Sequence, residues 1–244
     1  MHTLTPKKKW THYFWEFLML FLAVFCGFLA ENQREHMIEH TREKQYMRSL
    51  KEDVGADIKQ IDRLEIELQN FISRLDWIAD DLNQSFDRSS SLITFKKISM
   101  GFGFSDFIYT DRTMQQLKNA GGMRLIRNLK VADSIVEYDA MVRRGLAHQD
   151  LINTQYLARL VDKINYTFNI TEISKLANID YAKADTVNLR KSILLTHDKT
   201  ELIRLINEIR HYRFMIDIQL QYITEYRILA IRLCSFINKE YHLE

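Results

Sequence analysis

The feature that most constrains how this chain can fold is an apolar stretch close to its N-terminus. It runs from Trp10 to Ala30, and from Phe17 onward it contains no charged residue. As an α-helix of about 21 residues it would extend roughly 31 Å, which matches the hydrocarbon thickness of a bilayer. Helices buried in soluble proteins are rarely apolar on every side, whereas membrane-crossing helices are. The stretch therefore predicts a transmembrane helix.

A cleaved export signal is the main alternative, since the lysines at 7–9 precede the stretch in the order that a signal requires. The candidate cleavage sites are poor, however. Phe28 stands where a signal peptidase needs a small residue, and Phe25 precedes Cys26 where a lipoprotein signal needs one. We therefore predict an uncleaved signal-anchor and three regions: a basic N-terminal tail at 1–9, a transmembrane helix at 10–30 and a helical bundle domain at 31–244.

Two ionisable residues lie at the start of the predicted span. Trp10, Tyr13 and Trp15 are suited to the membrane–water interface, and Glu16 lies just inside them. His12 is four residues before Glu16, so the two side chains share a helix face and can pair. Ionisable groups within a span are functional candidates. The plainer interpretation is that Glu16 reaches the lipid headgroups.

The orientation of the span follows from the basic residues on its two sides. The three N-terminal lysines lie directly against the span, whereas Arg34, Arg42, Lys44 and Arg48 on the other side are spread over a longer segment. Under the positive-inside rule we favour a cytoplasmic N-terminus, with the large domain outside the inner membrane.

The chain contains one proline and seven glycines, so few positions interrupt a helix. From residue 47 to residue 82, apolar side chains recur every seven residues in two rows, which is typical of a helix within a coiled coil or a helix bundle. The rows are Met47, Val54, Ile61, Leu68, Leu75 and Leu82, and Leu50, Leu64, Phe71 and Ile78, with Asp57 as the one polar member. This helix either continues straight from the span or breaks between Asn32 and Glu39.

Two more long helices are predicted, over residues 131–168 and from Asp198 to Glu240. The first has an apolar face formed by Val131, Ile135, Tyr138, Val142, Leu146, Ile152, Tyr156, Leu160, Ile164 and Phe168. The second has seven-residue rows from Leu202 to Ile237, with Gln219 as a polar member. The predicted fold is therefore all-α, with the transmembrane helix continuing into a bundle of three or four long helices.

Shorter elements connect the long helices. Residues 83–92 form a loop rich in serine, and the aromatic segment "ISMGFGFSDFIYTD" at 98–111 either packs its own aromatic side chains or forms a short hairpin. Residues 110–128 predict a short helix that is capped by Thr110 or Asp111 and ends at Gly121-Gly122. Another short helix is predicted from Ile173 to Ala177.

No sequence motif for nucleotide binding, nucleophilic catalysis or a cysteine-based metal site is present. We therefore predict no catalytic residues, no cofactor and no enzymatic activity. His36 and His40 share a helix face and are weak candidates for a metal pair. Arg124, Arg127, Arg143 and Arg144 surround the glycine turn and can contact an anion, or they can simply solvate the bundle end. Charge beyond residue 30 is balanced, which argues against a nucleic-acid partner.

Two stretches resemble an uncharacterised family of bacterial single-span membrane proteins. The first is "FWEFLMLFLAVFCGFLAENQREHMIEHTREKQYMRSLKEDV" at 14–54, where a span leads into a helix. The second is "YTDRTMQQLKNAGGMRLIRNLKVADSIVEYDAM" at 109–141, where a short helix ends in a glycine turn before "RLIRN". The resemblance implies an anchored helical domain of unknown function in a bacterial membrane protein and brings no enzymatic activity with it. We expect the anchor to lie in the bacterial inner membrane.

These features favour a membrane-anchored, non-enzymatic interaction, scaffold or sensory module. Its expected partners are membrane lipid and further copies of the chain or other membrane proteins. One alternative is a component of an ion- or force-coupled membrane assembly that uses Glu16. A second alternative is a ligand-binding sensor or enzyme with a site near the arginines at the bundle end.

Overall fold

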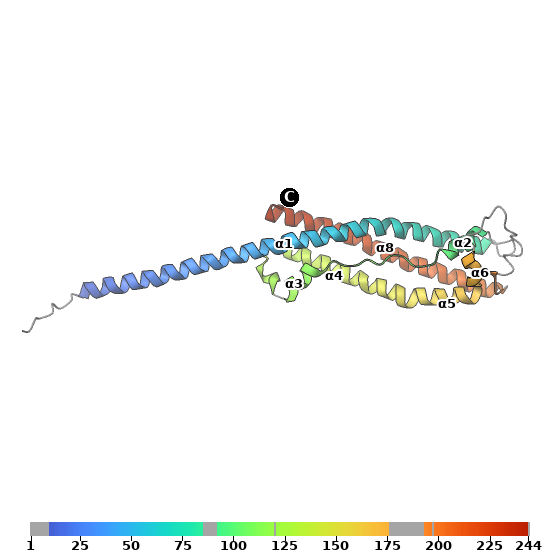
Figure 1. The fold of residues 1–244 in the computed structure, drawn as a ribbon, viewed down its shortest axis with the longest axis horizontal. Helices are drawn as coiled ribbons and strands as arrows, with labels where there is room; N and C mark the ends of the chain where they lie inside the picture. The colour runs from blue at the N-terminus through green and yellow to red at the C-terminus, as the bar shows by residue number, and fades with distance from the viewer. Residues whose placement is uncertain (1–9, 85–91, 120, 176–192, 197, 244) are drawn as a thin grey trace, which may run out of the picture.

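The computed structural model describes residues 10–84, 92–119, 121–175, 193–196 and 198–243, and these are mainly helical (Figure 1). Three long columns run side by side. They are α1 (Trp10–Gln84), then α4 (Leu129–Leu151) continued by η2 (Ile152–Tyr156) and α5 (Leu157–Thr167), and finally α8 (Lys199–Tyr241). Among the described residues the only β pairing is one isolated bridge between Phe168 and Leu194. The predicted all-α class is confirmed.

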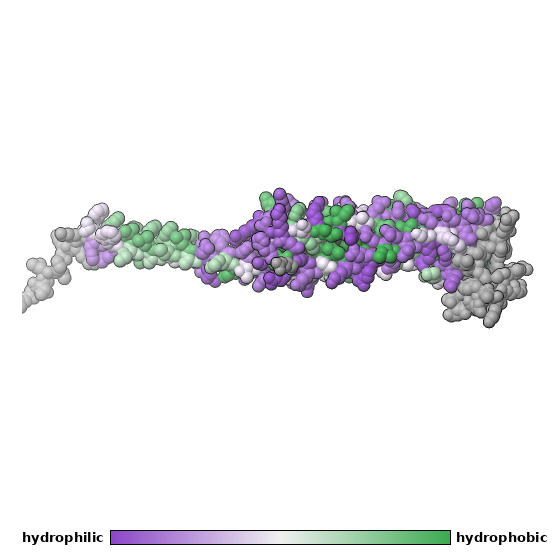
Figure 2. All heavy atoms as spheres, turned by 90° about the horizontal axis from the view of Figure 1, so that it is seen from above, coloured by the Kyte–Doolittle hydropathy of each residue, from purple (hydrophilic) through white to green (hydrophobic). Residues whose placement is uncertain are grey.

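Helix α1 is unbroken over 75 residues. It continues through the segment from Asn32 to Glu39, where a break was one of the two predicted alternatives. At 1.5 Å per residue it extends roughly 110 Å. An apolar window near its N-terminal end is long enough to cross a membrane, and the rest of the chain buries none of it. Figure 2 shows this window as a green band on a helix without neighbours. The first buried residue of α1 is Glu43, so the bundle begins there.

The bundle core is built from the predicted seven-residue rows. All the row members of α1 are buried, from Met47 to Leu82, and those of α8 are buried from Leu202 to Ile237. Helices α1 and α8 run antiparallel and pack along their shared length (Figure 1). Ion pairs flank this interface, including Arg227 with Asp62 at 2.8 Å and Arg213 with Asp76 at 3.2 Å.

The second column differs from the uniform helix predicted over residues 131–168. Residues 152–156 form a π-helical turn, which inserts one extra residue between α4 and α5. Before this turn the buried face passes through Gly145 and Gln149, and Leu146 is only half-buried. After it, Leu160 and Ile164 return to the core. The apolar faces of α4 and α5 are out of phase in the sequence, and the extra residue brings both onto the side of the column that faces the core.

The connections contain α2 (Leu92–Ser99), α3 (Arg112–Asn119), η1 (Gly122–Leu125) and α6 (Ile170–Lys175). Helix α3 and the turn after it confirm the predicted short helix, and Gly121 has the positive φ of 65° that such a turn favours. Helix α6 lies where a short helix was predicted, although Leu176 and Ala177 lie outside the described residues. The same is true of residues 85–91 of the predicted serine-rich loop.

The aromatic segment is neither a hairpin nor a self-packed loop. Residues 101–111, which we call the strap, run extended along the bundle from the end of α2 to the start of α3 (Figure 1). The strap's aromatic side chains pack on the long helices instead of on one another. Phe107 lies against Tyr226 of α8, for example, with ring centroids 5.2 Å apart.

Candidate functional site

Four buried carboxylates form the most unusual chemical feature of the bundle. Glu43, Asp53 and Asp57 come from α1, Asp139 comes from α4, and none is more than 4% exposed. A buried carboxylate is costly unless hydrogen bonds or cations compensate for its lost hydration. The partners of these four groups therefore show what the cluster does.

Asp53 and Asp57 bind the start of α3. Asp53 Oδ2 accepts hydrogen bonds from the main-chain N–H of Thr113 at 2.9 Å and from its hydroxyl, and Arg112 pairs with Oδ1 at 2.7 Å. Asp57 accepts from the N–H of Thr110 at 2.9 Å and from the hydroxyl of Tyr138 at 2.7 Å. Donors at the first turn of α3 are thus satisfied by another helix, through Asp53.

The predicted capping residues of α3 therefore have other contacts. Thr110 contributes its main-chain N–H to Asp57. The Asp111 carboxylate accepts from the side chain of Gln115 at 2.7 Å and lies 3.5 Å from the guanidinium of Arg143. A remote carboxylate on α1 replaces the local cap, a contact that sequence spacing could not reveal.

Glu43 and Asp139 hold the rest of the same connection. Glu43 Oε1 accepts from the N–H of Arg127 at 2.9 Å and from the hydroxyl of Tyr241 at 2.6 Å. Asp139 pairs with Lys118 of α3 and with Arg143, whose Nε lies 3.1 Å away. The four carboxylates together hold the described residues of 109–119 and 121–127 against α1, α4 and the end of α8.

The two central carboxylates have opposite pKa shifts. Burial raises the pKa of Asp57, and hydrogen bonds from Thr110 and Tyr138 only partly offset this effect. Burial also acts to raise the pKa of Asp139, but hydrogen bonds from Lys118 and Arg143 outweigh it and hold this pKa below its ordinary value. Burial and the nearby Asp57 charge raise the pKa of the Tyr138 hydroxyl, so it remains a hydrogen-bond donor.

Asn substitutions at these two positions are expected to change acid stability in opposite directions. Folded Asp57 binds its proton more tightly than the unfolded chain does, so the stability of the wild type relative to Asp57→Asn rises as pH falls from neutral towards about 4. Folded Asp139 binds its proton less tightly, so the stability of the wild type relative to Asp139→Asn is lost below pH of about 4. Urea midpoints measured across this pH range test both signs, and parallel curves for the two variants would contradict the assignment.

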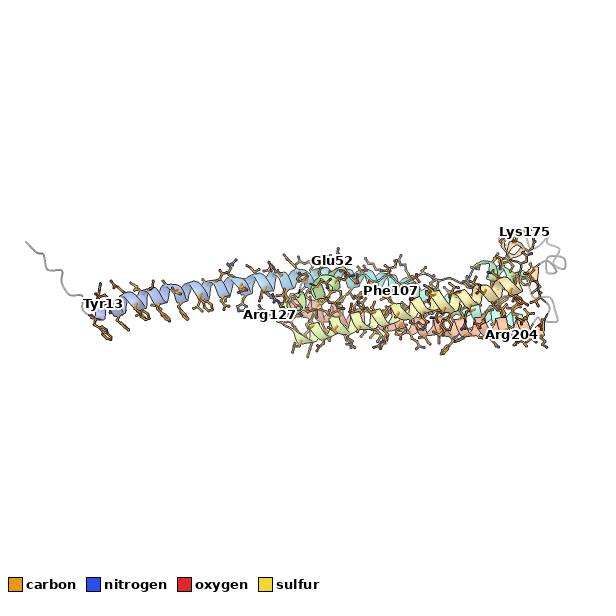
Figure 3. All side chains as sticks on the ribbon, turned by 90° about the horizontal axis from the view of Figure 1, so that it is seen from below. Tyr13, Glu52, Phe107, Arg127, Lys175 and Arg204 are labelled. Atoms are coloured by element: carbon orange, nitrogen blue, oxygen red, sulfur yellow. The ribbon has the colours of Figure 1, made fainter. Side chains whose placement is uncertain are left out.

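The four predicted arginines lie in different surroundings. Arg127 is 3.8 Å from Glu39, at the end of the bundle where α1 leaves it (Figure 3). Arg143 is engaged by Asp139 and Asp111. Arg144 lines a hollow between α4 and α8 that includes none of the other three, and Arg124 is exposed on η1.

The remaining candidates lie on the part of α1 outside the core. His12 Nε2 is 3.1 Å from Glu16 Oε1, so the expected pair forms. His36 and His40 each face a glutamate three residues ahead, Glu39 at 3.9 Å and Glu43 at 3.4 Å. Among the described residues, no cluster of three or more His, Cys, Asp or Glu side chains is arranged to hold a metal ion.

Sequence reasoning missed most of the residues that hold the strap and α3. Asp57 did give a signal, because it is the one polar member of an apolar row. Glu43 belongs to the same row, one heptad before Leu50, and extending the row backwards would have found it. Asp53 and Asp139 gave no such signal, because each lies beside an apolar row and not within it.

Comparisons with known proteins gave no match. No known protein family matches the chain, no curated protein matches its sequence, and no solved structure matches its fold.

Proposed function

We propose that this protein is a membrane-anchored, non-enzymatic interaction module, and that its bundle acts as a subunit of a homo-oligomer or a larger membrane complex. The observation that carries the proposal is the continuity of α1. One helix is apolar and uncovered over its first part and supplies a full side of the bundle core over its last part. The same helix therefore joins the apolar part to the bundle core without a break.

The buried carboxylates support the same proposal. Each accepts a hydrogen bond from a different residue of the connection between the columns, so the four carboxylates act as fixed anchors for that connection. We place the anchor in a bacterial inner membrane, with the N-terminus in the cytoplasm and the bundle in the periplasm. The lysines directly before the span support this orientation, and the resemblance of residues 14–54 and 109–141 supports the bacterial setting.

Cross-linking in native membranes tests the module hypothesis. Ile231 lines an open hollow between α1 and α8, and Ile228 is 54% exposed one turn away. Photo-reactive residues at these two positions are expected to give discrete adducts with the chain itself or with one membrane protein. The same probe at the exposed Ile203, near the far end of α8, is the matched control. Adducts that are absent or equally diffuse at all three positions would contradict the proposal.

A second candidate function rests on the close pair of His12 and Glu16, 3.1 Å apart at the start of the span. Under this alternative, Glu16 titrates as part of an ion-coupled assembly. Under the favoured function, Glu16→Gln is expected to complement a deletion strain as well as the wild type does, with Glu31→Gln as the control. A Glu16→Gln protein that reaches the membrane in normal amount but fails to complement would support the alternative instead.

A further inference from the structure

The bundle presents a basic segment at the end that is nearest the predicted span. From residue 112 to residue 132 the chain contains five basic residues and no acidic one. Two of the five are paired within the fold, Arg112 with Asp53 and Lys118 with Asp139. The other three are all exposed, and they are Arg124, Arg127 and Lys130. The segment therefore leaves three cationic side chains at the surface.

The acidic side chains beside this segment offset only part of its charge. Glu39 lies 3.8 Å from the guanidinium of Arg127, and Glu240 accepts a hydrogen bond from a neighbouring asparagine at 2.5 Å. Neither Arg124 nor Lys130 forms an ion pair within the part of the chain that the structure describes. An ion pair with both partners exposed is weak, so Arg127 also remains able to attract an anion.

Apolar side chains lie among the basic ones. Leu129, at the start of α4, is 75% exposed, and outside the predicted span no large apolar side chain of the described residues is more exposed. Met123 and Leu125 of η1 are half-buried. A surface that mixes basic and apolar side chains suits the boundary of an anionic membrane, where the charges meet the headgroups and the apolar groups enter between them.

The fold holds this segment close to the membrane. The main-chain N–H of Arg127 donates to Glu43 at 2.9 Å and its guanidinium lies beside Glu39, so the segment is fixed where α1 leaves the bundle (Figure 3). Glu39 is nine residues beyond Ala30, or roughly 14 Å along the helix axis. The headgroup layer occupies about 6 Å of this distance. The remaining gap of about 8 Å is one Debye length at physiological ionic strength, and a helix tilt of about 20° narrows it on one side.

We propose that residues 121–130 form a binding site for the anionic lipid headgroups of the membrane in which the chain is anchored. The proposal rests on the membrane anchor of the proposed function and adds a second contact with the same bilayer. A single span leaves the bundle free to tilt and rotate relative to the membrane. A contact to one side of the span removes that freedom and gives the bundle a fixed orientation.

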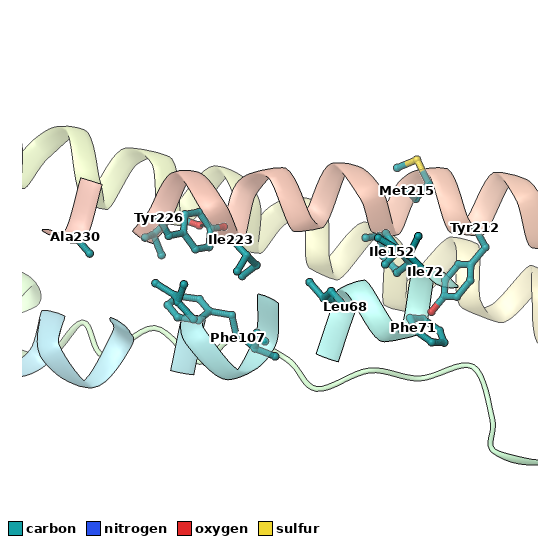
Figure 4. Close-up of a cluster of buried hydrophobic side chains, with 14 of the residues drawn as sticks. Leu68, Phe71, Ile72, Phe107, Ile152, Tyr212, Met215, Ile223, Tyr226 and Ala230 are labelled. Carbon is teal, nitrogen blue, oxygen red and sulfur yellow. Dashed lines mark hydrogen bonds between the residues drawn. The ribbon is translucent and has the colours of Figure 1, made fainter. Parts of the chain in front are cut away.

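A photo-reactive residue in place of Leu129 tests this contact in the full-length protein, reconstituted into vesicles of phosphatidylcholine and phosphatidylglycerol in a three-to-one ratio. Leu129 lies outside the core, part of which Figure 4 shows around Phe107 and Tyr226, so the probe is expected to leave the fold intact. Mass spectrometry is expected to find adducts with phosphatidylglycerol, and about fivefold fewer lipid adducts in vesicles of phosphatidylcholine alone. The matched probe position is Ile108, which is 71% exposed and bonded to Gln60, and it is expected to give no lipid adduct.

Removal of charge tests the role of the basic side chains. Arg124→Gln with Lys130→Gln is expected to lower the adduct yield at position 129 by about fivefold in the anionic vesicles. Lys59→Gln with Arg63→Gln removes the same charge from an exposed part of α1 further from the membrane and is expected to leave that yield unchanged. The proposal is overturned by adducts with protein alone, by equal lipid adducts at positions 108 and 129, or by a yield that is the same with and without the two charges.

Flotation of the vesicles separates this result from the anchor itself. Protein that floats with the vesicles but gives no lipid adduct at position 129 rejects the headgroup site alone. Protein that does not float rejects the anchor, and the proposed function with it.

Discussion

A Gly145→Ala variant is expected to lose about 3 kcal/mol of folding free energy, because a single added methyl group has no space at this position. A Cβ on Gly145 would overlap the hydroxyl oxygen of Tyr226 and approach the Tyr222 ring. The backbone of α4 cannot move away easily, since Gly145 is part of its buried face against α8. The ring of Tyr226 must move instead, which disturbs its hydrogen bond to the Val142 carbonyl and its packing on Phe107.

Thermal unfolding measures this loss as a fall in Tm of about 9 °C, at roughly 3 °C per kcal/mol for a chain of this size. Tyr226→Phe supplies the matched control, since it removes the overlapping oxygen and the hydrogen bond to Val142 at 3.2 Å, at a cost of about 1 kcal/mol. The double variant is expected to be more stable than the sum of the two single losses. Strictly additive losses would show that the hydroxyl is not what excludes a side chain at Gly145.

The long helices could be predicted from the sequence because their cores depend on local periodicity. The rows from Met47 to Leu82 and from Leu202 to Ile237 each repeat every seven residues, and packing buries them as rows. Such patterns can be recognised without knowing which helix packs against them, because any apolar neighbour can bury them. The same reasoning identified the span, where the signal is simply the absence of polar residues.

The π-helical turn could not be predicted from the apolar pattern. The predicted apolar face steps by six residues from Leu146 to Ile152, but this irregular step lies before the turn. It arises because Leu146 is half-buried and the buried face passes through Gly145 and Gln149 instead. Gly145 gave no sign of its role, because its requirement comes from Tyr226, far along the chain.

The strap could not be predicted because its contacts come from residues with no pattern of their own. Gln60 and Glu67 lie on the margin of α1, where polar side chains ordinarily face water, and Gln149 lies within the buried face of α4. Only the three-dimensional arrangement shows that they bind main-chain groups of one segment. A short hairpin, one of the two predicted alternatives, would have satisfied the same main-chain groups locally. The choice between a hairpin and the strap depends on tertiary contacts that sequence periodicity does not record.

Two arginines in the span are expected to release the protein from the membrane and leave its bundle folded. Leu20 and Val24 lie near the middle of the apolar stretch, and each is 68% exposed, with no bundle contact to lose. Each arginine near the centre of a span costs about 3 kcal/mol of insertion free energy, so Leu20→Arg with Val24→Arg opposes insertion by about 6 kcal/mol. Leu20→Ile with Val24→Ile preserves the apolar character and is the matched control.

Carbonate extraction and circular dichroism together decide the outcome of this test. The wild type and the isoleucine control are expected in the membrane pellet, and the arginine variant in the soluble fraction with an undiminished thermal transition. Loss of membrane binding is expected to leave folding unaffected, because the buried residues of α1 begin at Glu43, well beyond the substituted positions. An arginine variant that remains in the pellet, or a wild-type chain whose mature N-terminus lies beyond residue 30, would contradict the anchor. If the variant instead unfolds on release, α1 must transmit stability from the span into the core, which the uncovered segment before Glu43 argues against.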